Sequence, residues 1–103
     1  MTGAPETADR VRDAVLAVPG VVAMHAGAHG EVATHLPGRL VPGVRLGEGP
    51  RPTEVHVVAS TRAPLGDTAS AVHTALAPLA GVTGPVHVVV GDVAALGEQV
   101  PGA

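Results

Sequence analysis

The feature that most constrains the fold is a helix-like segment, ended by a glycine and followed at once by valine, that occurs twice. Residues 11–21 read VRDAVLAVPGV and residues 72–82 read VHTALAPLAGV, so that corresponding positions lie 61 apart. In both segments the apolar residues recur with helical spacing, and glycine is a typical helix terminator. The chain is therefore expected to contain two helices that each lead directly into a strand.

The spacing of apolar residues sets the bounds of these two helices. The first is predicted over about 6–18, with its apolar stripe at Ala8, Val11, Val15 and Val18. The second is predicted over about 67–80, with Asp67 as its N-cap and the stripe Ala69, Val72, Leu76 and Leu79. Pro78 removes a backbone donor, so we expect the last turn of the second helix to be distorted.

Alternating patterns predict the strands. TEVHVVAST at 53–61 carries the strongest pattern, and GPVHVVVGD at 84–92 predicts a final strand. The segment 21–27 reads as a short strand, and we expect it to pair with 31–36 as a hairpin. Residues 36–53 hold four prolines and four glycines and are predicted to form a loop, in which only 43–47 suits a short strand.

Two helices with one apolar stripe each require a sheet face to cover, which predicts an α+β fold of two layers. Both helices should pack on one face of a small mixed sheet, with the strands at 53–61 and 84–92 parallel across a helical crossover. A short helical turn at 92–98 is expected to follow. The whole chain, 1–103, is predicted to be a single domain, with frayed ends at 1–5 and 99–103.

Composition limits the classes of function. Of the 103 residues 46% are apolar, but Phe, Trp, Tyr and Ile are all missing, so the core must be built from Val, Leu, Ala and Met. The accompanying absence of Lys and Asn indicates the codon usage of a high-GC bacterium. There is no cysteine, the net charge is −3, and no apolar run approaches the ~20 residues of a membrane span. These features favour a cytoplasmic protein without thiol chemistry and without a charged nucleic-acid surface.

Six histidines are the main candidates for chemistry. His25, His29 and His35 lie within eleven residues, with Glu31 between them, which is a plausible set of zinc ligands. Their spacing matches neither a helical HExxH motif nor a zinc finger, and surface histidines are the favoured interpretation. Arg39, Arg45 and Arg51 in the segment 36–53 are interpreted as solubilising charges, with an anion-binding or acidic-partner patch as the alternative.

A second group of candidates comes from the motif VHVV, which occurs at 55–58 and again at 86–89. Alternation turns the histidines away from the apolar face, and two neighbouring imidazoles would repel each other when protonated, which would lower their pKa values. Valines on the same side are unexpected on a solvated face. We therefore predict an interaction surface formed by His56, Val58, His87 and Val89. The simpler interpretation is that histidine is only the polar partner in an alternating strand.

Other catalytic patterns are missing from the sequence. Ser60 and Ser70 have no GxSxG elbow, and GVRLGEG lacks the GK[ST] ending of a phosphate-binding loop. Without aromatic residues there is no platform for stacking bases. The sequence therefore predicts a protein that is not an enzyme, with no cofactor and no nucleic-acid partner.

The order of the motifs resembles the alkaline-shock-protein family, the envelope stress response proteins of Gram-positive bacteria. The resemblance covers about 8–93 and rests on VPGV, GVRLGEG, EVHVV, LAGV and VHVVVGDV in that order. It implies a small non-enzymatic α+β protein of the cytoplasm that serves in the cell-envelope stress response. It also implies a protein partner, which in some members is a membrane-anchoring protein, and self-association into homo-oligomers. Members usually have a strand before the first helix, and MTGAPET does not suit one.

A ferredoxin-like regulatory domain that binds a small ligand or a metal is the alternative. Its second half also passes from a helix ending in LPGV into a strand. The metal-chaperone version needs a CxxC loop, which a chain without cysteine cannot supply. Strand order discriminates between the two folds, because the ferredoxin-like fold requires a strand before its first helix.

Overall fold

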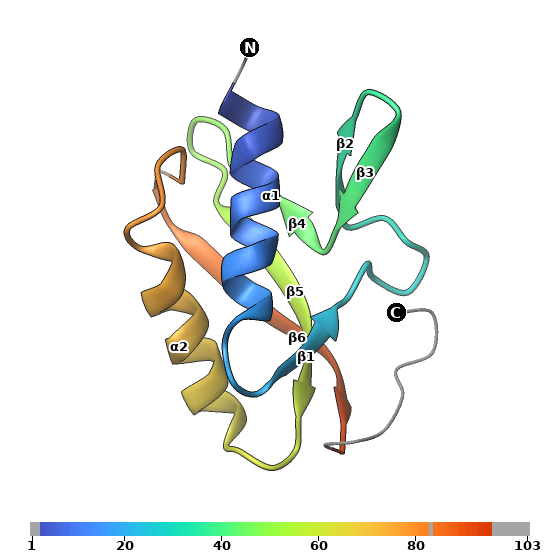
Figure 1. Cartoon of the computed structure of the whole chain (residues 1–103), viewed down its shortest axis with the longest axis vertical. Coiled ribbons are helices and arrows are strands. Elements are labelled where there is room, and N and C mark those ends of the chain that lie inside the picture. Colours follow the sequence, from blue (N-terminus) through green and yellow to red (C-terminus); the bar gives the residue numbers. More distant parts are fainter. Residues whose placement is uncertain (1–2, 83, 96–103) are drawn as a thin grey trace.

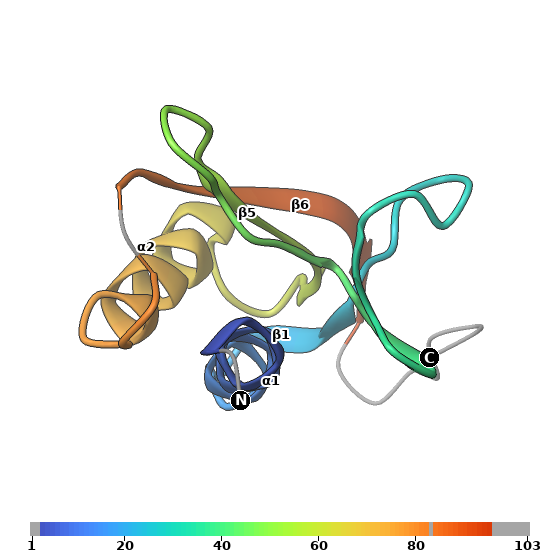
Figure 2. The same cartoon turned by 90° about the horizontal axis from the view of Figure 1, so that it is seen from above.

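The computed structural model describes residues 3–82 and 84–95 and shows an α+β fold in two layers (Figures 1 and 2). Two helices, α1 and α2, lie on the same side of a mixed sheet, as the apolar stripes predict. The elements in chain order are α1 (Gly3–Leu16), β1 (Val21–Met24), β2 (Ala33–Leu36), β3 (Arg39–Pro42), β4 (Val44–Arg45), β5 (Thr53–Ser60), α2 (Leu65–Leu76) and β6 (Val86–Ala94).

Strand β5 is the centre of the main sheet. β1 and β4 pair antiparallel with β5, at its end and its beginning respectively, and β6 pairs parallel with β5 along its whole length. The parallel β5–α2–β6 crossover confirms the prediction for 53–61 and 84–92. Because β5 and β6 pair directly, the unit differs from the split βαβ arrangement of the ferredoxin-like fold, in which another strand lies between the two.

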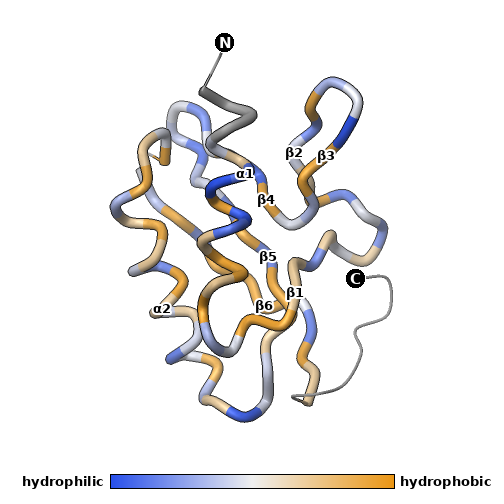
Figure 3. The backbone as a smooth tube through the Cα atoms, in the orientation of Figure 1, coloured by the Kyte–Doolittle hydropathy of each residue, from blue (hydrophilic) through white to orange (hydrophobic). Residues whose placement is uncertain are grey.

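The core lies between this sheet and the two helices. All four residues of the predicted α1 stripe are buried, and they pack with Val72 and Leu76 of α2 and with Val55 and Val57 of β5. Figure 3 shows hydrophobic residues along β1, β5 and β6, where the two layers meet. Each fully buried Val or Leu contributes about 1.5–3 kcal/mol, so valine supplies most of the stability that aromatic residues supply in other domains.

The repeated segment produces a reciprocal contact between the two helices. Gly20, after α1, has a φ of 100° and lies against Thr68 of α2, whereas Gly81, after α2, has a φ of 89° and lies against Thr7 of α1. A Cβ at Gly20 would be 2.7 Å from Thr68 Oγ1, and one at Gly81 would be 2.5 Å from Thr7 Oγ1. Thr7 and Thr68 are also 61 residues apart and both are 3% exposed. The repeat therefore includes the threonine that each helix presents to the other unit's glycine.

The hairpin predicted between 21–27 and 31–36 is wrong. β1 pairs with β5, and β2 pairs instead with β3, which lies in the segment expected to be a loop. Leu36 and Arg39 are opposite each other in the register, so Pro37-Gly38 forms a two-residue turn, and Gly38 has a φ of 75°. Proline followed by a glycine with positive φ suits a type II turn. Pro42 ends β3 and therefore interrupts no ladder.

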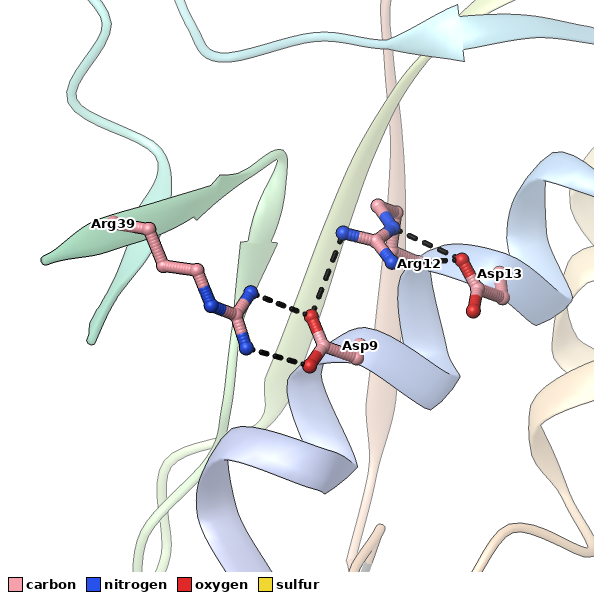
Figure 4. Close-up of polar contacts among 4 residues, drawn as sticks. All are labelled: Asp9, Arg12, Asp13 and Arg39. Carbon is pink, nitrogen blue, oxygen red and sulfur yellow. Dashed lines mark hydrogen bonds and ion pairs between the residues drawn. The ribbon is translucent and has the colours of Figure 1, made fainter. Parts of the chain in front are cut away.

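An ion pair fastens this hairpin to the helix layer (Figure 4). The two terminal nitrogens of the Arg39 guanidinium, Nη1 and Nη2, donate to the Asp9 carboxylate of α1, at 2.9 and 2.8 Å. Arg12 lies beside them, with its Nη1 3.4 Å from Asp9 and its Nη2 2.9 Å from Asp13. The hydrogen bonds from Arg39 are the main reason why the pKa of Asp9 is below its usual value, and the charges of Arg39 and Arg12 add to this effect.

The ends of several elements differ from the predictions. α1 begins at Gly3, so the first residues that the structure describes are helical rather than frayed. α2 begins at Leu65 after Pro64, which leaves Asp67 in the first turn rather than at the N-cap. α2 ends at Leu76, although Ala77 still has helical φ and ψ of −55° and −42°, because Pro78 lacks the backbone N–H that would extend the helix. Of the helical turn expected at 92–98, residues 92–94 belong to β6 and 96–98 lie outside the described residues, as do 99–103.

Candidate interaction surface

Strand β6 forms one edge of the main sheet. β5 has β1 and β4 along one side and β6 along the other, and none of the described strands pairs with the outer edge of β6. β6 is nine residues long, whereas β4 has two residues and β1 has four. Val89 and Val93 of this strand are 38% and 45% exposed. An edge strand of this length, with exposed apolar side chains, is a typical site for the addition of another strand.

The outer face of the sheet, which is turned away from the helices, carries the predicted surface residues. Alternation along β5 and β6 puts Glu54, His56, Val58, His87 and Val89 on this face, since Val55 and Val57 point into the core. In the register Glu54 is opposite His87 and His56 is opposite Val89. The two histidines are therefore diagonal to each other rather than directly opposite.

Two of the four predicted surface residues are exposed. His87 and Val89 lie on the open part of the outer face. The side chain of His56 is only 16% exposed, and Val58 is 3% exposed, so the expectation that Val58 is accessible is wrong. Val58 lies between Ala23 of β1 and Asp92 of β6 in the register, so it has a paired strand on each side. The accessible part of the predicted surface is therefore on β6.

A glutamate that the sequence analysis missed is the polar centre of this face. Oε1 of Glu54 lies 3.0 Å from Nε2 of His56 and 3.7 Å from Nη1 of Arg45. The hydrogen bond from His56 is the main cause that lowers the pKa of Glu54; partial burial acts against it, and the charges of Arg45, His56 and His87 add to the lowering. The alternation of EVHVV contained the signal, since it puts Glu54 and His56 on the same face.

His25, which follows β1, covers the outer face of the sheet next to Gly91. The imidazole of His25 lies over Gly91, where a Cβ would be 2.6 Å from Nδ1. Nδ1 also accepts a hydrogen bond of 3.0 Å from the backbone N–H of Gly27, which assigns the ring proton to Nε2 in the neutral form. Any side chain at position 91 would displace this ring, so glycine is needed here for close approach.

The histidines considered as zinc ligands have separate surroundings. Glu31 accepts a hydrogen bond of 2.9 Å from the backbone N–H of His29, and His35 lies exposed on β2. The pKa of Glu31 is lowered by a hydrogen bond from its own backbone and by this one from His29. Within residues 3–82 and 84–95, no three His, Asp or Glu side chains converge in a way that could hold a metal ion.

Two of the three arginines in the segment 36–53 are engaged with acidic side chains, Arg39 with Asp9 and Arg45 with Glu54. An open cleft of about 620 Å³ lies at the base of the hairpin, and its lining includes Thr34, Arg45, Glu48 and Arg51. Arg45 also donates to the carbonyl of Glu31 at 3.2 Å. An anion in this cleft would thus compete with acidic groups of the protein for the positive charge of the arginines.

Comparisons with protein-family models, with curated proteins and with solved structures find no match to this chain. Neither of the helices that the structure describes is long and apolar enough to cross a membrane.

Proposed function

We propose that this chain is a non-enzymatic interaction module that binds a protein through β6. The observation that supports this proposal is the outer edge of a nine-residue strand, which no described strand pairs with and on which Val89 and Val93 are exposed. A sheet edge offers backbone donors and acceptors in a row, and the side chains beside it provide specificity. His87 and Val89 supply such side chains on the outer face of the sheet.

The biological setting of the proposal comes from the resemblance to the alkaline-shock-protein family. On that basis the module acts in the envelope stress response, in the cytoplasm, and is held near the membrane by an anchoring protein partner. Self-association belongs to the same proposal.

The proposal is tested by comparing two matched variants with the wild-type chain. Val89→Glu puts a charge on the exposed edge strand, whereas Leu40→Glu makes the same kind of change on β3, where Leu40 is 48% exposed. Each tagged protein is cross-linked in its source cells after an alkaline shift, and the captured proteins are quantified by mass spectrometry. Circular dichroism first establishes that both variants are folded.

The expected result is one or a few proteins that are captured by the wild type and by Leu40→Glu but lost with Val89→Glu. An identical set of captured proteins for all three chains would contradict the assignment of β6 as the binding element.

A further inference from the structure

The outer edge of β6 has a defined pattern of outward backbone groups. The carbonyl of Pro85 accepts from the N–H of Thr53, and the carbonyl of Ala94 accepts from the N–H of Thr61, so both point toward β5. Backbone groups of successive strand residues point to alternate edges. The backbone groups of Val86, Val88 and Val90 therefore point outward, away from β5. After the irregularity at Gly91, the backbone groups of Val93 point outward as well.

The irregularity is a one-residue bulge. Val57 is opposite Val90 and Val58 is opposite Asp92, so Gly91 is an extra residue in β6. A bulge reverses the alternation of the side chains that follow it. Asp92 consequently lies on the outer face together with His87 and Val89, whereas Val93 lies on the same face as Val86, Val88 and Val90.

We propose that the occupant of this edge is a second copy of the same chain, joined by antiparallel pairing of the two β6 strands about a two-fold axis at Val89. This inference deepens the interaction role proposed above and rests on it. The axis puts Val89 of each copy opposite Val89 of the other, in a pair without direct hydrogen bonds. Val88 then pairs with the partner's Val90, and by symmetry Val90 pairs with the partner's Val88. Each of these two pairs exchanges two hydrogen bonds through its outward backbone groups, which gives four central hydrogen bonds.

The bulge makes the rest of this register self-complementary. Gly91 is the extra residue and has no opposite residue in this pairing. His87 therefore comes opposite the partner's Asp92 on the outer face, and Val86 comes opposite the partner's Val93 on the helix face. Valines thus meet valines, including both exposed ones, and the imidazole meets a carboxylate. Cross-strand pairs of these kinds stabilise a sheet, as the hydrophobic and oppositely charged pairs of natural sheets do.

Neighbouring registers lack this match. An axis at Val88 would put the partner's Asp92 opposite Pro85 and the partner's Val93 opposite Gly84. An axis at Val90 would put the partner's Asp92 opposite Val89, a charge against an apolar side chain. The axis at Val89 also keeps the helices of both copies on one face of a continuous sheet, because the two-fold axis is perpendicular to the sheet.

Single cysteines test the register, since the chain has none of its own. Residues opposite each other in a pair without direct hydrogen bonds have Cα atoms about 4.5 Å apart, within the range that a disulfide spans. Val89→Cys should therefore form a disulfide-linked dimer in mild oxidant, visible on a non-reducing gel. Val86→Cys and Val93→Cys should each remain monomeric on that gel when alone and should cross-link with each other when mixed.

Leu40→Cys is the matched control for random collision, because Leu40 is exposed on β3, away from β6. Native mass spectrometry of the wild type should show a species of twice 10.1 kDa that disappears in Val89→Glu. A Val89→Cys chain that cross-links no faster than Leu40→Cys, or a wild type that stays at 10.1 kDa, overturns the homodimer. If Val89→Glu nevertheless loses a captured protein in cells, the proposed interaction role stands while the second copy is rejected.

Discussion

The packing of the two helices depends on the absence of a Cβ atom at Gly20 and at Gly81. Both have positive φ, and both lie against a threonine hydroxyl of the opposite helix. A substitution at either position therefore meets a backbone penalty and a steric one. Gly30 offers a separation of the two effects, because its φ is 73° and nothing lies within 4 Å of a Cβ there.

We predict that Gly30→Ala lowers the free energy of unfolding by about 1–2 kcal/mol, the usual cost of left-handed backbone for a residue with a Cβ. Gly20→Ala should lower it by roughly 3 kcal/mol, since overpacking against Thr68 adds about 1–3 kcal/mol. Urea denaturation followed by circular dichroism measures both. Equal losses for the two variants would show that the contact with Thr68 contributes nothing.

Residue-level inference from the sequence was only partly successful for the candidate site. Alternation correctly turned His87 and Val89 away from the helices, because that property depends only on strand geometry. Whether Val58 is accessible depends instead on what flanks it, and the sequence did not reveal that β1 pairs with β5 at Val58. Glu54 was overlooked although the same alternation includes it.

Among the elements, the β2–β3 hairpin departs most from what the sequence suggests. The prolines of 36–53 indicated a loop, but Pro37 lies in the turn and Pro42 at the end of β3, where neither disrupts pairing. The dipeptide Pro37-Gly38 was a turn signal that local inspection could have found. The partner of β2 was predicted wrongly because a strand of four residues has little pattern of its own.

The attachment of this hairpin should depend on pH. Asp9 has a pKa below its usual value of 3.8 because Arg39 hydrogen-bonds to it, so the ion pair stabilises the folded state fully above pH 3.8. This contribution is lost as the pH falls through the lowered pKa. We predict that amides of 33–42 lose protection against hydrogen exchange at acid pH, and that Asp9→Asn shows the loss already at neutral pH.

Arg51→Gln is the matched control for Arg39→Gln. Both residues are exposed arginines of the same segment, but Arg51 forms no ion pair with an acidic side chain of residues 3–82 or 84–95. The Arg39→Gln variant should expose the hairpin amides to exchange at neutral pH, whereas Arg51→Gln should leave them as protected as in the wild type. Equal protection in both variants would mean that the ion pair between Arg39 and Asp9 does not hold the hairpin.

At the scale of the whole molecule, the two-layer α+β fold was predictable because it depends on long, repeated features. The stripe of α1 and the alternation of β5 and β6 each extend over eight or more residues, and a parallel crossover has few alternatives. The ends of helices and the pairing of four-residue strands depend on single contacts, and these were the points where the prediction failed.

A core without aromatic residues should tolerate little loss of volume. Leu76 is fully buried, and it is the largest such side chain in the described part of the chain. We predict that Leu76→Ala lowers the free energy of unfolding by about 2–5 kcal/mol, against a total of about 5–15 kcal/mol for a domain. Thermal denaturation measures the effect, and Leu40→Ala, at an exposed site, should change the melting temperature little. A loss below about 1 kcal/mol for Leu76→Ala would contradict a tightly packed core.

The reciprocal threonine–glycine contacts also have a mechanical consequence. Thr68 abuts Gly20 just after the end of α1, and Thr7 abuts Gly81 just after the end of α2. The two helices run antiparallel (Figure 1), so these contacts lie at opposite ends of the pair. Sliding of either helix along its axis would disturb both contacts at once. We therefore expect the two helices to move together rather than to slide past each other.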